Sequence, residues 1–137
     1  MNDMVFVFGS NEAGIHGAGA AKIALTQHGA LLGKGYGHHG NSFAIPTKDY
    51  HIRTLPLSQV RRYISHFIGY AIDHPELQFK VTRIGCGLAG FSNEDIAPMF
   101  LAAPDNCWFN TDWVEYLGDV NTWGPHRGNS STGLQNR

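Results

Sequence analysis

The sequence predicts an α/β fold, a three-layer α/β/α domain in which helices cover both faces of a mixed central sheet. Short apolar runs alternate along the chain with stretches of helical periodicity, as in wound α/β domains. The length of 137 residues and a hydrophobic content of 42% suit a single core. Two of the apolar runs lead directly into glycine-rich turns, as expected for buried strands that pass through glycines into a helix.

The first strand and the first helix are read from the N-terminal third of the chain. Residues 4–8 form a continuous apolar run between polar residues and glycines, as expected for a buried central strand. A helix is expected over residues 17–28, because Gly29 stands where a helix C-terminus favours glycine. A second short strand is expected at residues 42–45, ended by Pro46.

The clearest helix is expected between Ser58, a favourable N-cap, and Pro75, which ends it. The glycine- and histidine-rich residues 33–40, earlier in the chain, are expected to form a loop. The apolar residues of the helix recur at intervals of three and four and so form one stripe that faces the sheet. They are Val60, Tyr63, Ile64, Phe67, Ile68, Ala71 and Ile72.

The last third of the chain is expected to add two strands and a short helix. The strands are residues 79–84 and 106–109. Between them, Ser92 or Asp95 caps a helix that carries Pro98, which is tolerated in a first turn. These elements complete one domain over residues 1–123.

Residues 124–137 have few apolar side chains and are expected to form a mobile C-terminal tail.

Composition narrows the classes of partner and compartment. The net charge of −1 gives no overall basic field, so any contact with nucleic acid must use a local patch. Two cysteines are too few for a disulfide scaffold, and no apolar run is long enough for a signal peptide or a membrane span. We therefore expect a cytoplasmic protein with no membrane partner.

The two glycine-rich turns are the most informative feature of the chain. The first follows residues 5–8 and extends from Gly9 to the helix, and the second occupies residues 85–91. Glycines between a strand and a helix bring bare backbone N–H groups close to a ligand, and such groups attract phosphate. Two turns of this kind in one small domain indicate a nucleotide diphosphate held between them. The alternative is that these glycines only shape tight turns.

Other nucleotide and metal motifs do not fit. The glycines of the first turn are spaced G-x-x-G-x-G, which is not the dinucleotide-binding order, and residues 33–35 lack the Ser or Thr of a P-loop. The eight histidines include no H-x-x-x-H pair on a helix, and no C-x-x-C pair occurs. We therefore expect neither a metal site nor a cofactor.

Three short motifs, in this order, resemble a macro domain over residues 4–110. The resemblance is to the subclass that contains the DNA ADP-ribosyl glycohydrolase antitoxins and the human terminal ADP-ribose protein glycohydrolase. The chain is also similar to small macro-like proteins carried by bacteriophages, for which the compartment would be the host cytoplasm. The motifs are Asn11 with Gly14, Gly17, Gly19, Ala20 and Ala21, then Ile45-Pro46-Thr47-Lys48, then Arg83-Ile84-Gly85-Cys86-Gly87-Leu88.

The resemblance implies roles for residues of this chain. In the family the first glycine loop holds the distal ribose, the second embraces the diphosphate, and a lysine after a short strand does the chemistry. Lys48 and Asn11 therefore correspond to the catalytic residues. The residues implied in ligand binding are Ser10, Gly17, Ala18, Gly19, Ala20, Thr47, Gly85, Cys86, Gly87, Leu88, Ala89, Gly90 and Phe91.

The chemistry of these side chains agrees with such roles. A lysine beside a sugar can attack the anomeric carbon once it has lost its proton, or its charge can stabilise a leaving group. Asn11, expected just past the strand end, can hydrogen-bond ribose hydroxyls. The alternatives are that Lys48 is a loop lysine paired with Asp49, that Cys86 is a small residue that fits, and that Phe91 is a core residue.

One position departs from the family pattern. The protein-directed relative carries an aspartate after its G-C-G-L string, where this chain has Ala89, followed by Gly90. The DNA-directed antitoxins also lack an acid there, so the departure weighs against chemistry on protein glutamates. Asp49, Glu94 and Asp95 are the candidates for a substitute acid.

The expected function is an ADP-ribosyl glycohydrolase that binds ADP-ribose, or a related NAD-derived nucleotide, and removes ADP-ribose from modified nucleic acid or protein. The competing expectation is a non-catalytic macro module that sequesters ADP-ribose or a cyclic NAD-derived signal, for example in phage counter-defence. A third is an interaction domain whose glycines only shape turns.

Overall fold

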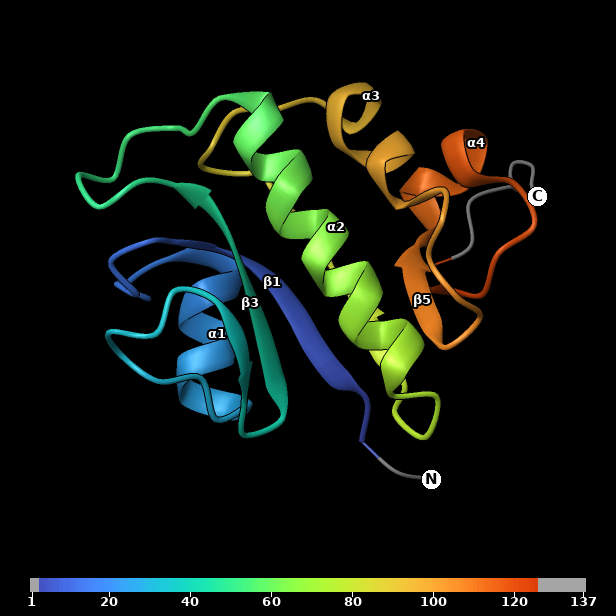
Figure 1. Cartoon of the computed structure of the whole chain (residues 1–137), viewed down its shortest axis with the longest axis horizontal. Coiled ribbons are helices and arrows are strands. Elements are labelled where there is room, and N and C mark those ends of the chain that lie inside the picture. The colour runs from blue at the N-terminus through green and yellow to red at the C-terminus, as the bar shows by residue number, and fades with distance from the viewer. Residues whose placement is uncertain (1–2, 126–137) are drawn as a thin grey trace.

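The computed structural model describes residues 3–125, and Figure 1 shows the arrangement of their elements. The strands form one mixed sheet in the order β2-β3-β1-β4-β5-β6, in which β2 is antiparallel to β3 and the other neighbours are parallel. The strands are β1 (Val5–Asn11), β2 (Gly37–His39), β3 (Ser42–Lys48), β4 (Phe79–Val81), β5 (Cys107–Asn110) and β6 (Thr122–Trp123). The helices are α1 (Gly19–Gln27), α2 (Leu57–Asp73), α3 (Asn93–Ile96) and α4 (Val114–Leu117), with 3₁₀ turns η1 (Ala97–Phe100) and η2 (Thr111–Trp113).

Alternating side chains of β1 pack into two separate cores on opposite faces of the sheet. Val5 and Val7 belong to the main core, which α2 covers. Phe6 and Phe8 belong to a smaller core, which α1 covers. Because successive side chains of a strand point to opposite faces, these two cores confirm an α/β domain with helices on both faces of its sheet.

The chain leaves β1 and β4 toward opposite faces of the sheet. After β1 it passes to α1 on the face of the smaller core. After β4 it passes to α3 and η1, whose Ile96 and Phe100 lie in the main core. Neighbouring parallel strands whose connections diverge leave a crevice at their carboxyl ends, where α/β proteins bind ligands.

The prediction that Pro46 ends the second strand is wrong, because β3 continues to Lys48. β2 pairs with β3 only up to Ala44, so Pro46 lies where β3 has a neighbour on one side only, and this is where a strand tolerates proline. The register with β1 shifts at this point, from Ser10 opposite Pro46 to Asn11 opposite Lys48. The shift leaves Thr47 as an extra residue, as in a β-bulge.

The boundaries of the long helix also differ from the prediction. The N-cap is Pro56 rather than Ser58, because the Pro56 carbonyl already accepts the N–H of Val60 at 3.2 Å. The helix ends at Asp73, before Pro75. The strand expected at residues 79–84 ends at Val81, where the chain begins its glycine-rich turn.

The remaining elements divide into confirmed and missed predictions. Ser92, one of the two residues predicted to cap this helix, is the N-cap of α3 and forms a reciprocal capping box with Asp95. The first helix begins at Gly19 rather than at residue 17, and Gly29 follows its C-cap with a φ of +79°. β2 lies within the expected loop 33–40, and β6 was not expected at all.

Most of the expected tail, residues 126–137, lies outside the described residues. No helix within residues 3–125 has the length and apolar character needed to cross a membrane.

Candidate functional site

A cleft of about 620 Å³ lies at the carboxyl ends of the neighbouring strands β1 and β4, where the chain leaves the two strands toward opposite faces of the sheet. This volume is typical of small-molecule sites. The expected site residues come together here, with the exception of Gly90 and Phe91. Those that line the cleft are Ser10, Asn11, Gly17, Ala18, Gly19, Ala20, Thr47, Lys48, Gly85, Cys86, Gly87, Leu88 and Ala89.

Gly90 and Phe91 close the second loop instead of lining the cleft. The N–H of Gly90 donates to the Gly87 carbonyl at 3.1 Å, and the N–H of Phe91 donates to the Gly85 carbonyl at 2.8 Å. The Phe91 side chain packs against the main core. Its position favours the core residue among the two interpretations of the sequence.

The second loop presents backbone N–H groups that no described residue satisfies. The amides of Gly87, Leu88 and Ala89 have no acceptor within residues 3–125. A side chain at Gly87 would meet no atom within 4 Å, and its backbone is not left-handed. The fold therefore does not require glycine at this position, whereas close approach of a ligand to the backbone would require it.

The first loop presents a similar set of backbone N–H groups at the start of α1. Its N-cap, Ala18, has no side-chain oxygen, so the amides of Gly19, Ala20 and Ala21 have no acceptor in the described part of the chain. Gly17 is open in the same way as Gly87. These amides carry the positive end of the helix dipole and lie on the same cleft as the second loop.

Asn11 is the last residue of β1 rather than the first residue of a loop. Its side chain holds the first loop in shape: Nδ2 donates to the Ile15 carbonyl at 2.7 Å, and the N–H of Ile15 donates to Oδ1 at 3.0 Å. The side chain is buried, and it still borders the cleft. Its observed role is to position the loop.

Lys48 ends β3 and is half-buried at the edge of the cleft. Its carbonyl accepts the N–H of Glu12 at 2.9 Å, and it forms an isolated bridge with Thr54. Among the described residues no ion pair joins it to Asp49. The Asp49 carboxylate instead accepts the N–H groups of His51 and Arg53, which lowers the pKa of Asp49.

None of the three candidate acids borders the cleft. Asp49 is held in its own turn, Asp95 caps α3, and Glu94 is exposed on α3. Within residues 3–125 no carboxylate lines the cleft, while two cations, Lys48 and Arg83, do. The electrostatic character of the site therefore favours an anion.

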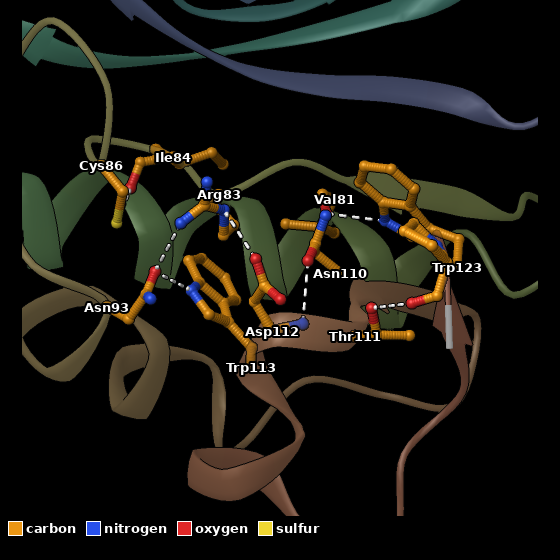
Figure 2. A network of polar contacts seen from close by, with 11 residues as sticks. Val81, Arg83, Ile84, Cys86, Asn93, Asn110, Thr111, Asp112, Trp113 and Trp123 are labelled. Carbon is orange, nitrogen blue, oxygen red and sulfur yellow. Dashed lines mark hydrogen bonds and ion pairs between the residues drawn. The ribbon is translucent and has the colours of Figure 1, made fainter. Parts of the chain in front are cut away.

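Arg83 also lines the cleft, and although it begins the third motif, the sequence analysis gave it no role in binding. Figure 2 shows its contacts: Nε lies 3.7 Å from Oδ2 of Asp112, and Nη1 donates to Oδ1 of Asn93 at 3.3 Å. Asn93 also accepts the indole N–H of Trp113 at 2.9 Å. This network links the second loop to η2 and orients the guanidinium at the cleft.

Trp123 and Asn110 close the far end of the cleft, and no motif identified them. The Trp123 indole donates to the Val81 carbonyl at 2.9 Å, which fixes the ring (Figure 2). The ammonium of Lys80 lies over the ring, 4.5 Å from its centroid. Oδ1 of Asn110 accepts the N–H of Asp112 at 2.8 Å. The result is an aromatic and amide surface at the opposite end from Lys48.

Cys86 is half-buried between Gly85 and Gly87 of the second loop. Its thiol points to the Ile84 carbonyl, with Sγ 3.6 Å from the oxygen. Burial raises the pKa of this thiol, and nearby Arg83 opposes that rise only in part. A protonated thiol is a poor nucleophile, which favours the interpretation of Cys86 as a small residue that fits.

Comparisons with known proteins leave the family unassigned. No family model matches the chain, and no curated protein matches it. One solved structure that does match is a protein of unknown function from Bacteroides thetaiotaomicron. It has 15% sequence identity and a TM-score of 0.46, with 89% of this chain and 88% of that chain covered. A likeness this distant carries no argument about function.

Proposed function

We propose that this protein binds ADP-ribose, or a closely related NAD-derived nucleotide, and removes ADP-ribose from modified nucleic acid. The observation that supports binding most directly is the pair of N–H sets on opposite sides of one cleft, Gly19–Ala21 and Gly87–Ala89, which lack acceptors in the described residues. Each set resembles a known mode of phosphate binding, one at a helix N-terminus and one in a backbone nest. A diphosphate supplies an oxygen-rich centre for both.

The order of the strands suggests how an extended nucleotide would lie. β3 and β6 are separated by four strand intervals, or about 19 Å at the usual spacing of about 4.8 Å. Lys48 stands at one end of this line and Trp123 at the other, with the amides between them. We propose that the ribose that carries the modified group lies at Lys48, and that the base lies against Trp123.

We propose that Lys48 is the catalytic residue of the hydrolysis. In the hydrolysis, the bond from the anomeric carbon to the acceptor breaks, and water supplies a hydroxyl to the carbon and a proton to the acceptor. A neutral Lys48 amine can attack the carbon and be released later by water, or its ammonium can stabilise the leaving group. Both routes need Nζ near the anomeric carbon.

A module that only sequesters the nucleotide is the second candidate. The observation that favours it is that no carboxylate in the described residues lines the cleft, because a general acid or base would assist turnover. Binding would be the same for both candidates, so the two differ only in product release.

Calorimetry with ADP-ribose on the variant Gly87→Glu tests binding. The added side chain brings bulk and negative charge to the open position beside the N–H groups of the loop, so we expect at least a hundredfold loss of affinity. Gly69→Glu is the matched control: residue 69 is exposed on α2, and a side chain there also meets no atom within 4 Å. Equal affinity in wild type and a folded Gly87→Glu would overturn the site.

A second measurement separates turnover from sequestration. ADP-ribosylated oligonucleotide and ADP-ribosylated protein are incubated with wild type, and free ADP-ribose is followed over time. Release from the oligonucleotide supports the glycohydrolase, whereas tight binding without release from either substrate supports the sequestering module.

A further inference from the structure

The charges of this protein are segregated along the chain, although its net charge is only −1. Residues 13–48 contain lysines but no Asp or Glu, whereas residues 84–125 contain carboxylates but no Lys or Arg. The first stretch forms α1, β2 and β3, and the second forms α3, α4, β5 and β6. Because β2 and β6 are the two edges of the sheet, these stretches occupy opposite ends of the molecule, as α1 and α4 show in Figure 1. One end of the protein is therefore cationic and the other acidic.

The cationic end carries exposed apolar side chains on the segment between α1 and β2. Leu31 is 51% exposed and Leu32 is 67% exposed, and the exposed Lys34 follows them in the same turn. We call these three residues the tip. Single exposed apolar side chains need no explanation, but two adjacent leucines in one turn form a contiguous apolar surface.

The backbone of the tip is fixed, although its side chains are exposed. The N–H of Lys34 donates to the Leu31 carbonyl at 3.2 Å, and the N–H of Gly33 donates to the Gly14 carbonyl at 2.9 Å. The Leu31 carbonyl also accepts a hydrogen bond from Nε2 of the buried His16 at 3.0 Å. A Cβ at Gly14 would collide with the backbone of Lys34, so the two loops pack backbone against backbone. A segment that is already ordered loses little entropy when it docks.

A second cavity, of about 310 Å³, lies at the acidic end. Leu101, which is 65% exposed, and Leu117 give it an apolar wall, and Asp105 and Asp119 add two carboxylates. Neither carboxylate forms an ion pair with a described residue, and no Lys, Arg or His in the described part of the chain lines the cavity. Cys107, the first residue of β5, also lines it, so the cavity lies at the amino end of that strand, away from the main cleft. We call it the acidic cavity.

The tip and the acidic cavity complement each other in charge and in polarity. Leucines beside an ammonium match an apolar wall beside two unpaired carboxylates. The tip directly precedes β2 and the cavity borders β5, and these strands are separated by four strand intervals, or about 19 Å. The tip therefore cannot reach the cavity of its own chain, whereas a second copy of the protein supplies a matching tip.

We infer that the tip of one copy docks in the acidic cavity of a second copy. Leu32 packs against the wall formed by Leu101, and the ammonium of Lys34 pairs with the carboxylates of Asp105 and Asp119. The two docking surfaces differ, so the contact is heterologous and repeats from copy to copy, either closing into a ring or extending as a chain. Neither surface lines the main cleft, so this inference does not rest on the proposed function.

Sedimentation velocity of the full chain tests the inference. We expect the weight-average sedimentation coefficient of wild type to rise with protein concentration, and association to weaken as salt screens the ion pairs. Leu32→Ser should weaken association at least tenfold because it removes a buried apolar side chain, and Lys34→Glu should do so because it replaces attraction with repulsion.

Two variants are matched controls for the tip. Tyr50→Ser removes an equally exposed side chain, at 69%, and Arg61→Glu reverses an exposed charge on α2. Each should change association less than twofold. Wild type that stays monomeric at every concentration overturns the inference, and so does an equal loss of association in either control.

A mixing experiment tests the pairing of tip and cavity directly. The Lys34→Glu chain keeps an intact cavity, and the chain with Asp105→Lys and Asp119→Lys keeps an intact tip, so each should be monomeric alone and the mixture should form a one-to-one complex. Leu101→Ser is a second cavity variant that retains both carboxylates, and it should complement Lys34→Glu in the same way. If wild type associates but neither mixture does, the contact is not between tip and cavity and the inference fails.

Discussion

Two glycines of the second loop, Gly85 and Gly87, should respond in opposite ways to the same substitution. Gly85 has a φ of +79°, and a Cβ there would lie 3.0 Å from Cδ2 of Phe91. Gly87 has no such restriction, and a Cβ would meet no atom within 4 Å. We therefore expect Gly85→Ala to lower stability, and Gly87→Ala to lower affinity for ADP-ribose.

The magnitude for Gly85→Ala follows from its backbone. The left-handed conformation costs an alanine about 1–2 kcal/mol, and the tight contact with Phe91 adds to this. Reduced entropy of the unfolded chain offsets about 0.4–1 kcal/mol. The net loss is about 1–2 kcal/mol, which corresponds to a fall in Tm of about 3–8 °C in a domain of this length.

For Gly87→Ala the expected change is in the affinity for ADP-ribose rather than in stability. Its backbone suits alanine, so we expect Tm to remain within about 2 °C of wild type. A methyl group beside the N–H groups of Leu88 and Ala89 would displace a bound phosphate, and we expect at least a tenfold loss of ADP-ribose affinity, or about 1.4 kcal/mol.

Thermal melts and calorimetry on the same preparations measure both quantities, with Gly69→Ala as the control. Gly69 is itself exposed on α2, where alanine should raise stability by up to about 1 kcal/mol without changing affinity. Wild-type affinity in Gly87→Ala would contradict the assignment of its loop to phosphate. An unchanged Tm in Gly85→Ala would contradict the argument from its backbone.

Two further predictions concern Lys48 and Phe91. Lys48→Ala should abolish release of ADP-ribose while much of the binding persists, because backbone N–H groups supply most of the affinity. In single-turnover assays, Lys48→Arg should be inactive if the amine attacks as a nucleophile, and largely active if only its charge is needed. Phe91→Ala should lower the free energy of unfolding by about 2 kcal/mol, because the Phe91 ring packs on the core. The affinity for ADP-ribose should change less than in Gly87→Ala. A stable variant that has lost affinity would show instead that Phe91 contacts the ligand.

Much of the fold could be predicted because apolar patterning depends on which faces are buried. The alternating packing of β1 and the stripe on α2 follow directly from that patterning. The path of β3 through Pro46 could not be predicted, because it depends on how far the neighbouring strand β2 extends. β2 itself was missed because its glycine and histidines have no strand pattern of their own, and its pairing with β3 creates it.

The lining of the candidate cleft could be predicted where glycine turns follow strands, and not where it depends on tertiary contacts. The glycines gave the two loops, and their place at one cleft follows from the neighbouring strands β1 and β4. Trp123 could not be found, because it reaches the cleft through a two-residue strand at the sheet edge. Asn11 was predicted to be a catalytic residue able to hydrogen-bond ribose hydroxyls, and nothing in the sequence indicated that its side chain hydrogen-bonds Ile15 and shapes the first loop.

The net charge of −1 is compatible with the proposal that the cleft binds an anion, because most of the donors in this cleft are backbone N–H groups. Partial charges at a helix N-terminus and in a loop attract phosphate at short range without changing the net charge of the protein. Free ADP-ribose should therefore bind with only a weak dependence on salt concentration. A steep fall in its affinity as salt rises would contradict this assignment of the donors to backbone N–H groups.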